Sequence, residues 1–211
     1  MRLLANIAIT TALLLGLLTS CGPEQEAPLT PEPEAPEVPE VPEVPEEPEE
    51  PEFPENPLST LEGDIEVLFN ADNSLSYADC FGNYYHTDSY MWGLYFQNYT
   101  SKEQIYVEIM DQDYLFEIPL GTYTASDDIY STGVLIKGGF DVDGYSAYSW
   151  YTRLKSDNHS GATAPIFGGS ITIEEAGDGL HRVVFDLIDD RGNKITGSYE
   201  GLMVLEDFRI N

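Results

Sequence analysis

Residues 58–211 are predicted to fold as an all-β domain, an antiparallel β-sandwich or barrel of roughly 8–10 strands. Three observations support this fold class. Tyr, Phe, Trp, Val, Ile and Thr, which favour strands, dominate the segment. No window of eleven residues carries an apolar stripe at helical spacing without a Gly, a Pro or a strand-like run interrupting it. Turn residues separate the apolar segments at short intervals, as in sandwiches and barrels.

The predicted strands are residues 64–70, 74–80, 89–97, 104–110, 114–118, 132–138, 146–154, 169–175, 180–188 and 195–205. The alternation is clearest near the C-terminus, where Val183, Phe185 and Leu187 share one face. Turns at residues 176–179 and 189–193 flank that strand, and their glycine and asparagine residues supply the positive φ angles that tight hairpins need. The C-terminal third is therefore predicted to be a meander of three or four strands.

The N-terminus predicts a targeting segment and a lipid anchor. Arg2 is followed by a mostly apolar run from Leu3 to Leu18, a length that suits a secretory signal better than a membrane span. The run ends in Leu-Thr-Ser-Cys21, which resembles the lipobox of bacterial lipoproteins. That resemblance implies cleavage after residue 20, lipidation of Cys21 and an outer-membrane location, since Gly22 replaces the aspartate that retains such proteins at the inner membrane. Two or more acyl chains would anchor the chain stably.

Residues 21–57 predict a stiff, acidic stalk in the polyproline II conformation. From Pro36 to Pro57 a proline recurs at every third residue, and from Glu37 to Glu55 a glutamate recurs with the same period. Polyproline II has three residues per turn, so one edge of the rod is all proline and another all glutamate. Residues 22–57 could extend about 110 Å at about 3.1 Å per residue. A spacer that holds the domain away from the membrane fits this simple repeat better than a recognition motif does.

Charge and cysteine content exclude some partners. Residues 58–211 hold 25 acidic and 8 basic residues, a net charge of −17. Nucleic-acid binding is excluded, because it requires Lys and Arg to replace counterions. With Cys21 lipidated, Cys80 is the remaining cysteine, so the chain cannot form an internal disulfide. We expect Cys80 to be a small buried residue rather than a reactive thiol.

A second resemblance concerns the domain itself. The run from Phe185 to Gly201, Phe-Asp-Leu-Ile-Asp-Asp-Arg-Gly-Asn-Lys-Ile-Thr-Gly-Ser-Tyr-Glu-Gly, and the earlier Ile118-Pro-Leu-Gly-Thr-Tyr-Thr124 resemble poorly characterised β-sandwich surface lipoproteins of Gram-negative anaerobes. The similarity covers about half of the domain. It implies a fold and carries no catalytic residues.

No catalytic constellation is visible. The three histidines are dispersed without a zinc motif, and no Gly-x-Ser-x-Gly elbow occurs. Asp141-Val-Asp143-Gly144 resembles the opening of a calcium loop, but Tyr145 and Thr152 stand where an EF-hand needs ligands. The alternative for Asp141 and Asp143 is a solvated acidic turn, and Ca²⁺ at these two residues is the one cofactor that the sequence suggests. We expect no enzyme activity.

Aromatic residues give the functional hint. They crowd residues 84–99 and 145–151, and strand alternation places at least one large ring on each face. Only one face needs to be core, so exposed rings could bind sugars or proteins. Our candidate ligand-binding residues are Trp92, Tyr95, Tyr148 and Trp150. The leading hypothesis is a lipid-anchored, surface-displayed binding or adhesion module with a glycan ligand. The alternatives are a protein ligand, a structural envelope lipoprotein without a small ligand, and a hydrolase whose carboxylates converge only in three dimensions.

Overall fold

A computed structural model of the chain describes residues 52–70, 72–112, 115–156 and 159–209. The predicted signal peptide, Cys21 and the stalk up to residue 51 lie outside the described residues. The described part contains thirteen strands and no helix, so it holds no helix long and apolar enough to cross a membrane. The predicted all-β fold is thereby confirmed. The strands are β1 (Ile65–Asn70), β2 (Ser74–Gly82), β3 (Tyr90–Asn98), β4 (Glu103–Asp111), β5 (Gly121–Ser126), β6 (Val134–Ile136), β7 (Gly139–Phe140), β8 (Ser146–Ala147), β9 (Trp150–Leu154), β10 (Ser160–Gly177), β11 (Leu180–Asp189), β12 (Lys194–Gly201) and β13 (Val204–Asp207).

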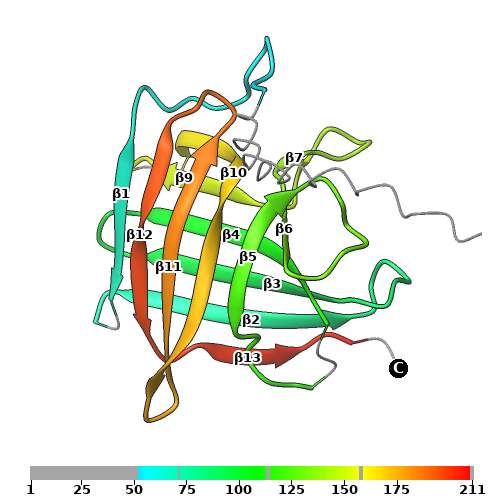
Figure 1. Cartoon of the computed structure of the whole chain (residues 1–211). Helices are drawn as coiled ribbons and strands as arrows, with labels where there is room; N and C mark the ends of the chain where they lie inside the picture. The colour runs from blue at the N-terminus through cyan, green and yellow to red at the C-terminus, as the bar shows by residue number, and fades with distance from the viewer. Residues whose placement is uncertain (1–51, 71, 113–114, 157–158, 210–211) are drawn as a thin grey trace, which may run out of the picture. The chain divides into compact units, whose positions relative to one another are not determined.

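Two layers of strands cross each other steeply (Figure 1). The front layer has the order β1-β12-β11-β10-β5, and the back layer has the order β13-β2-β3-β4-β9. The long strand β10 belongs to both, because its first half pairs with β9 and its second half with β5 and β11. On the other side β6 joins β5 to β4. This is the arrangement of an orthogonal sandwich, in which strands pass from one layer to the other at corners.

Most neighbouring strands are antiparallel, as predicted, but three pairs are parallel: β1 with β12, β5 with β6, and β2 with β13. The chain thus adds its first and last described strands to the outsides of the layers. The core lies between the layers and is built from the inward residues of each strand, among them Leu94, Phe96, Phe185 and Tyr199. Alternate residues face this core because successive side chains of a strand point to opposite sides.

The corner in β10 depends on glycine. The pairing of β10 with β11 shifts between Ile166 and Gly168, and Gly169 has a φ of 84°. A Cβ at position 169 would lie 2.0 Å from the carbonyl oxygen of Asp186 on the neighbouring strand. Only glycine allows both the left-handed backbone and this close approach.

The turn between β11 and β12 holds the start of the domain in place. The buried carboxylate of Asp190 accepts hydrogen bonds from the backbone N–H groups of Leu58 and Ser59. The hydroxyl of Ser59 donates to Asp189 at 2.6 Å, and Arg191 donates to the Ser59 carbonyl at 2.6 Å. This turn lies within residues 185–201, one of the two segments that resemble surface lipoproteins. The role of its acidic pair, Asp189 and Asp190, is structural.

Three predicted strands need correction. Residues 115–118 form no strand, because Phe116 stacks on Trp92 and Ile118 packs against the core, so this apolar loop covers the end of the sandwich. The predicted strand 146–154 is interrupted at Tyr148, whose φ of 67° breaks it into β8 and β9. The predicted strand 195–205 is two strands, because β12 ends at Gly201 and β13 then pairs with β2 in the other layer.

Candidate functional site

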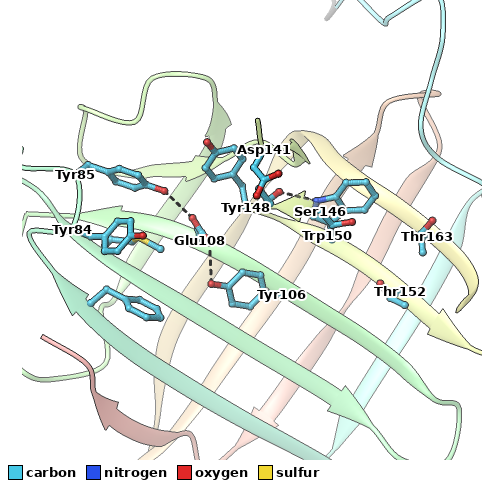
Figure 2. A pocket seen from close by; sticks show the side chains of 13 residues that line it. Tyr84, Tyr85, Tyr106, Glu108, Asp141, Ser146, Tyr148, Trp150, Thr152 and Thr163 are labelled. Carbon is cyan, nitrogen blue, oxygen red and sulfur yellow. Dashed lines mark hydrogen bonds between the residues drawn. The ribbon is translucent and has the colours of Figure 1, made fainter. Parts of the chain in front are cut away.

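A groove of about 610 Å³ lies on the outer face of the back layer, the face turned away from the core. Its floor comes from β2, β3, β4, β9 and β10, and the loops before β3 and β9 form its walls (Figure 2). The lining residues are Phe81, Tyr84, Tyr85, Met91, Tyr106, Glu108, Asp141, Ser146, Ala147, Tyr148, Trp150, Thr152 and Thr163. Aromatic rings dominate this lining, and Glu108 and Asp141 are its two acidic members.

Strand alternation places the floor residues. In β4, Ile105, Val107 and Ile109 face the core, so Tyr106 and Glu108 face the groove. The same rule sends Tyr151 of β9 into the core and its neighbours Trp150 and Thr152 outward. The groove floor is therefore the polar and aromatic side of strands whose other side is packed.

Glu108 is the central polar group of the groove. Its carboxylate accepts one hydrogen bond from the hydroxyl of Tyr106 at 3.1 Å and another from the hydroxyl of Tyr85 at 3.2 Å. Figure 2 shows Glu108 between these two tyrosines, with each hydroxyl directed at the carboxylate. The Glu108 N–H donates to the hydroxyl of the buried Ser149 at 3.1 Å. The carboxylate is thus held in one orientation by Tyr106 of its own strand and by Tyr85 from the loop before β3.

Burial governs the electrostatics of this group. Glu108 is 8% exposed. Loss of solvent raises the pKa of the Glu108 carboxyl, and the two tyrosine hydrogen bonds partly oppose that rise. The pKa values of Tyr85 and Tyr106 are also raised, chiefly by burial and then by the neighbouring carboxylate. Both tyrosines therefore stay protonated and keep donating to Glu108.

Trp150 supports one wall of the groove. Its ring nitrogen donates to the carbonyl oxygens of Gly139 at 3.2 Å and Ala147 at 2.8 Å, and its ring lies 5.6 Å from that of Phe140. The indole therefore fixes the β7–β8 hairpin over the sheet. Tyr148 lines the groove from the same hairpin (Figure 2).

The four aromatic candidates from the sequence have different placements. Tyr148 and Trp150 line the groove, although Trp150 is only 9% exposed. Tyr95 faces outward on β3, half-buried and outside the groove lining. Trp92 is a correction: it is 1% exposed in the core and stacks on Phe116, so it cannot contact a ligand. Strand alternation alone does not say which face is core, so the sequence could not distinguish Trp92 from an exposed ring.

The calcium hypothesis for Asp141 and Asp143 finds no further ligands. Oδ1 of Asp141 accepts the N–H groups of Asp143 and Tyr145, which closes the turn between β7 and β8. Within the described ranges, no three His, Cys, Asp or Glu residues are grouped as a metal ion would need. Cys80 is buried as expected, and burial raises the pKa of its thiol.

Glu108, Tyr85 and Tyr106 were not predicted as a site. Tyr106 and Glu108 alternate with apolar residues along one strand, which marks the outer face of any half-buried strand and gives no reason to select them. In the sequence, Tyr84 and Tyr85 are distinguished only as members of an aromatic run. What makes the site is the packing of a loop near residue 85 and a hairpin near residue 148 over β4, and neither contact can be read from local sequence.

Comparison with known proteins does not assign the domain to a family. No family model matches the chain, and neither curated proteins nor solved structures give a significant match.

Proposed function

We propose that this protein is a lipid-anchored, surface-displayed binding module whose groove binds a glycan. The observation that carries the proposal is the groove itself, in which aromatic rings surround a fixed carboxylate. Sugars present flat C–H faces, which pack on aromatic rings, and hydroxyl groups, which donate to carboxylates. Glu108 with Tyr84, Tyr85 and Tyr148 supplies both kinds of contact.

The predicted anchor supports display at the surface. In this proposal Cys21 carries the lipid, residues 22–57 extend from the outer membrane, and the domain faces the surroundings of the cell. Among the described residues, the ring of Phe53 packs 6.0 Å from that of Phe167, so the end of the stalk segment contacts the domain. A spacer of this kind would suit a module that must reach ligands beyond the membrane surface.

A glycan array probed with the mature full-length chain tests the proposal. Three variants accompany it: Glu108→Gln, Tyr84→Ala and the control Tyr130→Ala. Tyr84 and Tyr130 are both exposed tyrosines, at 56% and 69%, but only Tyr84 lines the groove. We expect wild type and Tyr130→Ala to bind the same glycans, and both groove variants to lose them. A blank array, or equal binding by all four proteins, would contradict glycan binding in the groove.

A carboxylate-based hydrolase is the second candidate, favoured by one observation. Glu108 and Asp141 line the same groove, and burial raises the pKa of Glu108, as for a general acid. However, Oδ1 of Asp141 already accepts two backbone N–H groups and closes its own turn, which makes Asp141 a poor catalytic partner for Glu108. We therefore favour binding without catalysis. Release of reducing ends from a bound glycan, abolished by Glu108→Gln, would reverse that order.

A further inference from the structure

Four aromatic side chains form a row across the outer face of the back layer. Tyr77 of β2 is paired with Tyr95 of β3, Tyr95 with Tyr106 of β4, and Tyr106 with Trp150 of β9. Residues paired directly on neighbouring strands project to the same side of a sheet. Since the residues before and after Tyr77 and Tyr95 are buried, both rings face outward with Tyr106 and Trp150. We call these four residues the aromatic row.

The aromatic row begins in the groove and continues beyond it. Trp150 and Tyr106 line the groove, whereas Tyr95 and Tyr77 lie on the open sheet, half-buried, with ring centroids 6.4 Å apart. Neighbouring strands lie about 4.8 Å apart, so the row from Trp150 to Tyr77 is about 14 Å long. A ligand no larger than a disaccharide would leave part of this surface unused.

A row of carboxylates runs beside the aromatic row. Glu206 of β13 is paired with Asp79 of β2, Asp79 with Gly93 of β3, and Gly93 with Glu108 of β4. Asp79 is half-buried and lies on the same outer face as Tyr77. Burial and the charge of Glu206 raise the pKa of Asp79. This line of acceptors suits donors such as sugar hydroxyls and repels an anionic polymer.

We infer, on the basis of the glycan-binding function proposed above, that the ligand is an extended, uncharged polysaccharide chain. It lies across β9, β4, β3 and β2, with one end beside Trp150, sugar faces on Tyr106, Tyr95 and Tyr77, and hydroxyl groups directed at Glu108 and Asp79. The length of the row selects a chain over a single terminal sugar. The adjacent carboxylates select a neutral polymer over an acidic one.

Titration calorimetry on the mature full-length chain tests the inference. The neutral probes are the linear dimers and hexamers of β-1,4-linked glucose, mannose and xylose, and the acidic probe is the hexamer of galacturonic acid. We expect at least one neutral hexamer to bind about tenfold more tightly than its dimer, and the acidic hexamer to bind more weakly than that hexamer. Tyr95→Ala and Tyr77→Ala should weaken hexamer binding about tenfold and leave dimer binding unchanged.

Tyr95→Phe and Tyr130→Ala are the controls. The first keeps the ring of the aromatic row, and the second removes an exposed ring outside it. Both should bind the hexamer as wild type does, which separates the loss of a stacking surface from a folding defect.

Three outcomes would overturn the inference: equal affinities for dimer and hexamer, full hexamer affinity in Tyr95→Ala and Tyr77→Ala, or preference for the acidic hexamer. Binding by none of the hexamers would do so too. In each case, array binding that Glu108→Gln loses would leave the proposed glycan-binding function standing, without an extended neutral chain as its ligand. If the array were blank as well, both the inference and the proposed function would be contradicted.

Discussion

Gly93 leaves open the space beside the Tyr106 hydroxyl. A Cβ at position 93 would lie 2.8 Å from the hydroxyl oxygen of Tyr106 and 3.1 Å from the Phe81 ring. Gly93 is paired with Glu108, the residue to which Tyr106 donates. Because Gly93 has no side chain, there is room for the hydrogen bond from Tyr106 that orients the groove carboxylate.

Gly93→Ala should displace the Tyr106 hydroxyl and weaken its hydrogen bond to Glu108. We expect the free energy of unfolding to fall by about 1 kcal/mol, the usual contribution of such a bond. Gly63→Ala is the matched control, because a Cβ there meets nothing within 4 Å, and it should change stability by less than about 0.5 kcal/mol. Urea unfolding of both variants measures this difference. Equal stabilities would mean that Tyr106 moves aside without loss.

Glu108→Gln should alter the dependence of stability on pH. Burial raises the pKa of Glu108 above its ordinary 4.5, so the folded protein holds this proton more tightly than the unfolded chain. The resulting contribution to stability is complete below the unfolded-state pKa and is lost as the pH rises through the folded-state pKa. Glutamine carries no such proton. The stability of Glu108→Gln relative to wild type should therefore increase with pH and then level off.

Urea unfolding between about pH 4 and pH 8 follows this relative stability. Glu66→Gln, which removes an exposed carboxyl on β1, is the comparison variant. A Glu108→Gln curve that stays parallel to wild type would show that burial does not alter the proton affinity of Glu108.

Gly169→Ala should damage the corner where β10 passes between the layers. Gly169 and Gly177 have the same φ of 84°, but a Cβ at 169 would lie 2.0 Å from the Asp186 carbonyl oxygen, whereas one at 177 meets nothing within 4 Å. Gly177→Ala should cost about 1–2 kcal/mol from backbone strain alone. Gly169→Ala should cost about 3 kcal/mol or more. Similar losses in thermal unfolding of the two variants would argue against a close-packed corner.

Asp190→Ala should release the start of the domain. The substitution leaves the N–H groups of Leu58 and Ser59 without their acceptor, at a cost of about 2–3 kcal/mol. Hydrogen exchange at these two amides should accelerate, while exchange in β11 stays slow. The control Asp186→Ala removes an exposed aspartate of β11 and should leave both amides protected. Unchanged exchange in Asp190→Ala would show that other contacts hold the segment.

The fold class could be predicted because local patterns report it directly. Val183, Phe185 and Leu187 alternate into the core as predicted. The first half of β10 was missed, because Gly161, Ala162, Ala164 and Pro165 have low strand propensity and its pairing with β9 stabilises it instead. β5 was missed because the apolar residues just before it resemble a strand, although they close the end of the sandwich.

The site was less predictable than the fold. Periodicity identified Trp92 and Trp150 as equivalent strand aromatics, yet one is in the core and the other in the groove wall. Which face of a strand is covered depends on packing with the second layer. Glu108 became notable only through Tyr85, which comes from a loop before β3 and contacts it in three dimensions.

The two tryptophans allow the most direct test of ligand binding in the groove, since the chain has no others. Trp92→Phe leaves Trp150 as the fluorophore in the groove, and Trp150→Phe leaves Trp92 in the core. Each variant would be titrated with the glycan that binds best on the array, while tryptophan emission is recorded. We predict a saturable change in Trp92→Phe and none in Trp150→Phe. No change in either protein, or the same change in both, would contradict binding in the groove.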